Sequence, residues 1–148
     1  MKISEGAINF NKEILFGEIG AVFAAPIFSH IFSKFSLAAN VLATLTVLSV
    51  MIIASLLWLV MRIYDKSREG KIETGKFIKD LAYLTPVASA LAFTIYYPTL
   101  FFLSLYFFEN NYGVASSAAI SQISAFVIFL LALNTYRYFL LKVVGKKL

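Results

Sequence analysis

The chain has 148 residues, of which 60% are hydrophobic and only 14% are charged. A soluble domain usually contains about 45–50% apolar and about 25% charged residues, so this composition excludes an ordinary soluble globule. Aromatic residues make up 16% of the chain, which excludes intrinsic disorder. The absence of cysteine excludes disulfide bonds and thiolate metal sites. We therefore expect an integral membrane protein that has no metal site and no cofactor.

Four apolar segments are long enough to cross a bilayer as helices, which takes about 20 residues each. They are expected at approximately residues 14–33, 37–61, 86–108 and 114–137. Thr85 and Pro86 mark the start of the third helix, because Thr is a favoured N-cap and Pro is favoured at the first helical position. Together the segments predict an all-α fold, an integral membrane four-helix bundle that forms one transmembrane domain over residues 1–148.

Residues 74–84, which precede the third helix, alternate lysines and an aspartate with apolar residues. This alternation predicts a short amphipathic helix on the membrane interface. A solvated loop is the alternative.

Lysine and arginine residues are distributed unevenly between the two sides of the predicted bundle. Twelve of the 13 lie before the first helix, between the second and third, or after the fourth, and only Lys34 lies on the opposite side. Because cytoplasmic loops carry the excess of Lys and Arg, both termini are expected in the cytoplasm of a multi-pass cell-membrane protein. The net charge of +5 thus indicates topology and not nucleic-acid binding.

The two halves of the chain resemble each other. Gly17 and Gly20 followed by Pro26 correspond to small residues followed by Pro98, at an offset of 72. Residues 35–38 resemble residues 112–115, at an offset of 77. Because both hairpins start and finish on the same side, they are expected to be parallel repeats related by an axis along the membrane normal. A proline kink at matching depth in each hairpin is a further expectation.

Glu18 is the residue with the strongest indication of function, since a carboxylate within a membrane helix is costly. One interpretation makes it a cation or proton site, or a partner of Arg62 or Arg137 at the same depth. The alternative is a carboxylate that extends its charge toward the cytoplasmic headgroups. Beside Glu18, the small residues Gly17, Gly20 and Ala24 predict close packing against another helix.

Polar residues elsewhere in the helices are weaker candidates for binding substrate or ions. Asn40 lies in the second helix and Asn134 in the fourth. The fourth helix also has a stripe of serines with Gln122 beside it. Such residues more often form hydrogen bonds between helices. No catalytic motif, phosphate-binding loop or metal cluster is present in the sequence, so an enzyme is not expected.

The helix ends resemble those of the GtrA-like family, small four-helix membrane proteins of cell-surface polysaccharide assembly. The resemblance rests on three segments: a Gly-rich first helix at residues 16–20, a small-residue start to the second helix at 37–43, and an Asn-to-Arg-aromatic end at 133–139. Residues 62–64 keep the Arg and the aromatic residue but lack the preceding Asn. The resemblance implies a role in translocating a polyprenyl-linked sugar, or in assisting a partner glycosyltransferase.

Two alternatives come from other classes of membrane protein. Small multidrug transporters carry a glutamate in the first helix, in a context like that of Glu18, which would make this chain a cation or drug transporter. The chain lacks their other motifs. The second alternative is a non-catalytic subunit of a larger membrane complex. The expected partners are accordingly membrane lipids, a polyprenyl-phosphate sugar, and a second copy of the chain or another membrane protein.

Overall fold

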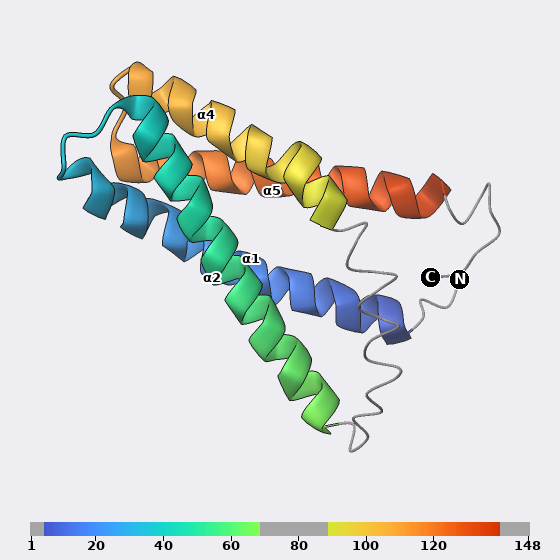
Figure 1. Ribbon diagram of the computed structural model, residues 1–148. Helices are drawn as coiled ribbons and strands as arrows, with labels where there is room; N and C mark the ends of the chain where they lie inside the picture. Colours follow the sequence, from blue (N-terminus) through green and yellow to red (C-terminus); the bar gives the residue numbers. More distant parts are fainter. Residues whose placement is uncertain (1–4, 69–88, 140–148) are drawn as a thin grey trace.

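Four helices long and apolar enough to cross a membrane make up the computed structural model, which describes residues 5–68 and 89–139 (Figure 1). Helix α1 spans Glu5–Ser33 and α2 spans Ala39–Arg68. The third span, Ser89–Glu109, contains a π-helical turn, η1 (Ala92–Tyr96), followed by α4 (Tyr97–Glu109). Helix α5 spans Val114–Phe139. The chain is therefore a small polytopic membrane protein with an all-α four-helix fold, as the sequence predicts.

The helix bounds differ from the predicted ones most at the start of α1, which begins at Glu5 and not near residue 14, and at the end of α2. This helix begins at Ala39 and continues to Arg68, well beyond the expected end at residue 61. Its additional turns bring Asp65 to Lys12 of α1, with 2.8 Å between Oδ1 and Nζ. The expected interfacial segment, residues 74–84, and the expected start of the third helix at residue 86 lie outside the described residues.

The helices form two parallel hairpins, α1 with α2 and the third span with α5. Both short connections, residues 34–38 and 110–113, lie at one end of the bundle, which we call the connection end (Figure 1). Helix α1 packs most extensively against α2 and also against α5, while α4 packs against α2 and α5. Away from the connection end, α2 diverges from the third span (Figure 1).

The two hairpins are structurally equivalent at a constant offset of 75 residues. Each connection has one residue with a left-handed backbone, Ser36 (φ 52°) and Asn111 (φ 57°). The first backbone bond of the following helix also matches: Leu42 N–H donates to Ala38 in one, and Ser117 N–H to Gly113 in the other. Seven pairs of residues are buried in both halves at this offset: 21 with 96, 25 with 100, 29 with 104, 42 with 117, 43 with 118, 46 with 121 and 50 with 125.

This offset corrects the values of 72 and 77 expected from the sequence. Residue 75 positions after Pro26 is Phe101, and residue 75 positions before Pro98 is Phe23. The prolines therefore lie at different depths, so the expected matching kinks are not equivalent. The same offset relates Arg62 to Arg137 at the far ends of α2 and α5.

The π-helical turn is explained by Pro98. Proline has no N–H and its ring excludes the carbonyl four residues earlier, which is that of Thr94. The turn widens by one residue, and Tyr97 N–H donates to the carbonyl of Ala92. Such single π-turns inside helices are frequent at functional sites. Here the turn ends at Tyr96, whose side chain is buried.

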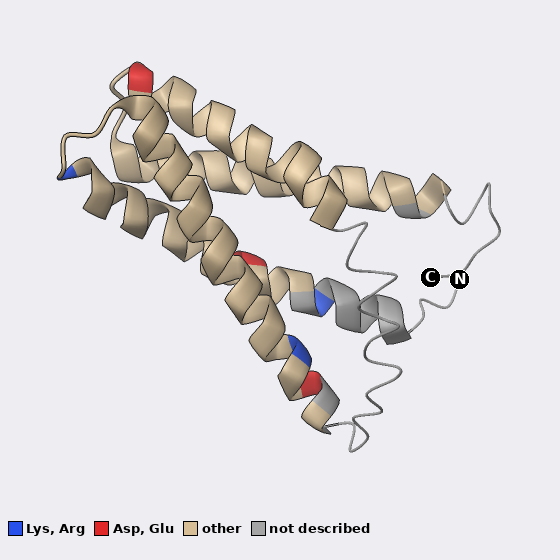
Figure 2. Cartoon of the chain, viewed as in Figure 1, with Lys and Arg blue, Asp and Glu red and all other residues tan. Residues whose placement is uncertain are grey.

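Charged side chains in the described part of the chain lie mostly toward the helix ends, with long uncharged stretches between them (Figure 2). Glu18 and Arg62 are exceptions. They lie within the candidate spans Ile14–Ser33 and Ala39–Asp65 and are only 7% and 4% exposed.

Candidate functional site

The Glu18 carboxylate lies at the centre of a buried polar cluster formed by three helices. The Tyr96 hydroxyl donates to Oε2 at 3.0 Å, and Gln122 Nε2 donates to Oε1 at 2.6 Å. Gln122 Nε2 also donates to the Tyr96 hydroxyl oxygen. We call Glu18, Tyr96 and Gln122 the carboxylate cluster. It joins α1, η1 and α5, so each of these elements contributes one side chain.

The cluster uses every hydrogen that its three side chains offer when Glu18 is ionised. Both N–H groups of Gln122 and the O–H of Tyr96 donate to oxygens within the cluster. One buried atom is left over, since Gln122 Oε1 has no hydrogen-bond partner in the described chain. A buried acceptor without a donor is costly, and more so inside a membrane. The cluster therefore retains an unused oxygen next to its carboxylate.

Small residues let α1 approach α2 closely beside Glu18. A Cβ atom on Gly17 would lie 3.0 Å from the Ala54 carbonyl oxygen, and one on Gly20 would overlap the Leu57 side chain. Ala24 is also buried. Backbones that approach through small residues are typical of membrane helix pairs. This contact places Glu18 on the interior side of α1.

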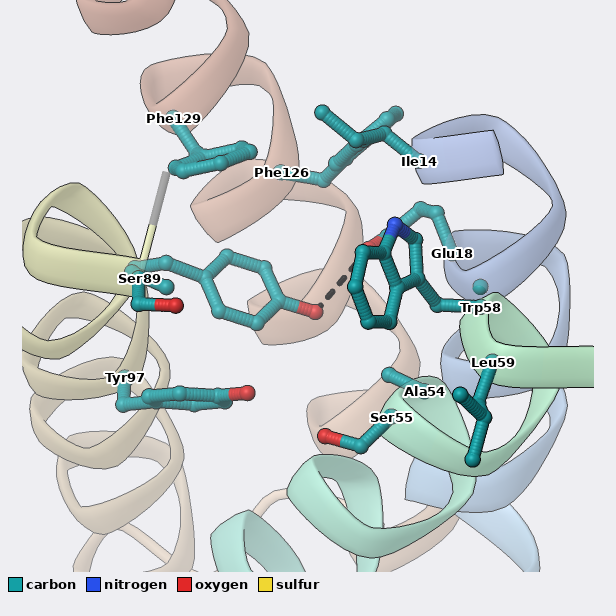
Figure 3. Close-up of a pocket in the computed structure, with 13 residues that line it drawn as sticks. Ile14, Glu18, Ala54, Ser55, Trp58, Leu59, Ser89, Tyr97, Phe126 and Phe129 are labelled. Atoms are coloured by element: carbon teal, nitrogen blue, oxygen red, sulfur yellow. Dashed lines mark hydrogen bonds between the residues drawn. The ribbon is translucent and has the colours of Figure 1, made fainter. Parts of the chain in front are cut away.

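A pocket of about 380 Å³ opens beside the carboxylate cluster, between α1, α2, the third span and α5 (Figure 3). Five of the 13 described residues that line it are aromatic: Trp58, Tyr96, Tyr97, Phe126 and Phe129. Among the described residues that line it, Glu18 alone is charged. Figure 3 shows the Trp58 and Tyr97 rings on opposite sides of the cavity, with Glu18 behind Trp58. A single carboxylate among aromatic rings favours a cationic ligand.

The remaining candidates from the sequence are not brought to this pocket. Arg62 is buried, and its guanidinium lies 5.2 Å from the centre of the Trp58 ring. Arg137 lies in the last turns of α5, and its side chain is outside the described part of the structure. Asn40 and Asn134 are exposed and bond locally, to the amide of Val41 and the carbonyl of Leu130.

No described group of three or more His, Cys, Asp or Glu side chains could hold a metal ion. The carboxylate cluster instead offers the oxygens of Glu18, Tyr96 and Gln122. Only Glu18 among them carries a formal charge.

The sequence alone did not identify the partners of Glu18. In the sequence, Tyr96 is one of many aromatic residues in the third span, and Gln122 is typical of a contact between helices. One available signal was the position of Gln122, a large polar residue beside the serine stripe of an apolar helix. A second was Pro98, because a proline inside a helix changes the register of the turn before it.

Comparison of the chain with known protein families, curated proteins and solved structures gives no match.

Proposed function

We propose that this protein binds a lipophilic organic cation in the pocket and exchanges it for a proton on Glu18. The observation that carries the proposal is the buried carboxylate in a cavity within the membrane spans. The other described residues that line this cavity are uncharged, and five of them are aromatic. A volume of about 380 Å³ lies in the range of pockets that hold small organic ligands. Aromatic faces attract cations, and they do so more strongly where water is excluded.

The exchange conserves charge and protons. In the empty state a proton neutralises Glu18, and when the cation binds, that proton leaves to water and the carboxylate becomes the counter-ion. The unpartnered Gln122 Oε1 fits this cycle, because rotation of the amide would let it accept the hydrogen of a protonated Glu18. Tyr96 then stays bonded to the second carboxyl oxygen in both states.

A role in carrying polyprenyl-linked sugar, implied by the GtrA-like resemblance, leads to the opposite expectation for this pocket. Its ligand would carry a phosphate, and a phosphate is repelled by a carboxylate that has lost its proton. The charge of the preferred ligand therefore separates the two functions.

Trp58 provides a direct test, because it is the only tryptophan in the chain and it lines the pocket. Titration of the purified protein with tetraphenylphosphonium should quench its fluorescence in a saturable way and release protons into weakly buffered solution. Glu18→Gln should abolish both signals. Glu109→Gln is the matched control, since Glu109 is an exposed glutamate at the connection end.

Undecaprenyl phosphate is the second probe. Saturable quenching by this lipid, with none by the phosphonium ion, would overturn the cation proposal and favour the GtrA-like role. No response to either probe would also overturn it, and would favour an accessory subunit of a larger complex.

A further inference from the structure

Four buried hydroxyl groups, one from each helix, occupy symmetry-related positions in the bundle. Ser29 of α1 and Ser104 of α4 are 75 residues apart, as are Thr46 of α2 and Ser121 of α5. All four residues are fully buried, with no exposed surface. The offset is the one that relates the two hairpins. Each pair therefore lies at one depth, on opposite sides of the axis between the hairpins. We call these four residues the hydroxyl layer.

Two members of the hydroxyl layer have unused hydrogen-bonding capacity. The Ser104 and Ser121 hydroxyls have no hydrogen-bond partner in the described part of the structure. Ser29 and Thr46 donate only to carbonyls of their own helices, those of Pro26 and Leu42. A serine in a membrane helix ordinarily bonds in this local way. The Ser104 and Ser121 hydroxyls lie in the protein interior and do not form this local bond. They therefore indicate polar positions suited to bound water.

The hydroxyl layer lies between the carboxylate cluster and the connection end. Ser29 and Ser104 each precede the left-handed residue of their connection by seven positions, or about 10 Å of helix. Ser121 directly precedes Gln122, whose Oε1 is the third unpartnered buried atom on these helices. Buried polar atoms without a partner thus occur at the level of the carboxylate cluster and again nearer the connection end.

We infer that the hydroxyl layer is part of a proton path between Glu18 and the aqueous phase at the connection end. This inference rests on the proposed function, because a path is needed only if Glu18 gains and loses a proton. Along the path a hydroxyl oxygen accepts a proton from water and its own hydrogen passes to the next oxygen, so no net charge stays on a serine. The last transfer protonates the carboxylate, and the reverse sequence releases the proton.

The groups that surround the carboxylate restrict where the proton can stop. From the third span, Tyr96 and Tyr97 are the titratable groups beside Glu18, and from α5 the neighbour is the neutral Gln122. From α2, the pocket is lined by uncharged residues only. Within the hydroxyl layer itself no member carries a charge. Glu18 is therefore the end point of the path in the described part of the chain.

The test follows the protonation of Glu18 in proteoliposomes by its reaction with dicyclohexylcarbodiimide, which modifies protonated carboxyl groups. The chain has no cysteine, so a single Asn111→Cys and an impermeant biotin maleimide select the molecules whose connection end faces outward. Mass spectrometry then gives the labelling of Glu18 at different outer pH values and a fixed inner pH. We expect the labelling rate to change by up to about tenfold for each unit of outer pH.

The decisive variants differ in a hydroxyl but not in size. Ser104→Val with Ser121→Val replaces each hydroxyl by a methyl group and adds a second methyl group, and the response to outer pH should be lost. Ser104→Thr with Ser121→Thr has nearly the same volume, keeps both hydroxyls and should respond as the parent does. Ser49→Val with Ser124→Val is the control, since this pair is also 75 residues apart but only partly buried.

Labelling in the parent chain that ignores outer pH would overturn the inference, as would an unchanged response in the valine variant. If the double valine variant does not fold, the single variants Ser121→Val and Ser121→Thr can be compared in the same way. Failure of the proposed function looks different. In that case tetraphenylphosphonium leaves Trp58 fluorescence unchanged, while the labelling of Glu18 still follows outer pH through the hydroxyl layer.

Discussion

Glu18 of α1 and Gln122 of α5 are 104 positions apart in the chain and are joined by a hydrogen bond of 2.6 Å between Oε1 and Nε2. This bond connects the first hairpin to the second at the level of the pocket. One of the two interpretations of the sequence is that the carboxylate extends toward the headgroups. The structure shows that it does not. It is held inside the bundle by two neutral side chains, and this arrangement leads to the first prediction.

Removing the hydroxyl of Tyr96 should destabilise the protein. Tyr96→Phe deletes a buried hydrogen bond to the carboxyl group of Glu18. Such a bond contributes about 0.5–1.5 kcal/mol when the carboxyl group is protonated and about 1.5–3 kcal/mol when it is ionised. Reversible unfolding in sodium dodecyl sulfate measures the change in free energy. Tyr97→Phe is the control, because Tyr97 also lines the pocket but does not bond to Glu18. Equal losses from the two variants would contradict the geometry of the carboxylate cluster.

Tyr96 and Gln122 should act as a unit. Combining Tyr96→Phe with Gln122→Leu should cost less than the sum of the two single changes, because each variant already disrupts the bonds of the other residue. Coupling energies of about 0.5–3 kcal/mol are typical of residues in one network. The same unfolding measurement on all four proteins gives the coupling. Strict additivity would show that the two side chains do not interact.

The contact between α1 and α2 should tolerate no large side chain at Gly20. Gly20→Leu is expected to prevent correct packing, since even a Cβ there overlaps the Leu57 side chain. Loss of the monodisperse peak in size-exclusion chromatography, or a lower melting temperature, would show it. Gly113→Leu is the matched control, because a Cβ at Gly113 has no neighbour closer than 4.0 Å. Equal tolerance at both sites would mean that the small residues are incidental.

Pro98 should be required for the position of Tyr96. Pro98→Ala restores an N–H and removes the ring, so the turn is expected to return to regular α-helical bonding. Closing the π-turn rotates the preceding residues by about 100° relative to the rest of the helix. We expect phosphonium binding to weaken while the thermal stability stays the same or rises. Unchanged binding in this variant would show that Tyr96 does not depend on the π-turn.

The orientation in the membrane is a separate prediction. Single cysteines at Ser36 and Asn111, in the two connections, should react with an impermeant reagent added outside intact cells. A cysteine at Ser67, near the end of α2, should react only after the membrane is opened. Labelling of Ser67 from outside would overturn the placement of both termini in the cytoplasm.

The fold could be predicted from the sequence because the bilayer imposes a length and a hydrophobicity on each span. The parallel hairpins were also predictable, although their offset was not, since apolar helices resemble one another at several registers. The carboxylate was identified by its cost in a membrane, but its partners were not. The positions of these partners depend on the π-turn at Tyr96 and on the side of α5 that packs against α1. Neither can be derived from the hydrophobic periodicity of the sequence.

Gly17 and Gly20 predict that α1 packs closely against another helix. They do not predict which residues of that helix lie opposite them. In the structure Gly17 lies against the backbone of Ala54, a residue that nothing in the sequence of the second helix distinguishes. Small residues indicate that some helix approaches closely, and only the crossing of two helices decides which residues meet.

The offset of 75 relates most of the interior of one hairpin to the other, but the counterpart of Glu18 is Phe93. Two identical hairpins arranged by the same rotation would each bring a carboxylate into the interior, and two like charges in an apolar medium repel strongly. Joining unequal halves in one polypeptide removes one of those charges. A single chain can thus hold one acid in a site whose walls come from both halves, which an assembly of equal hairpins cannot do.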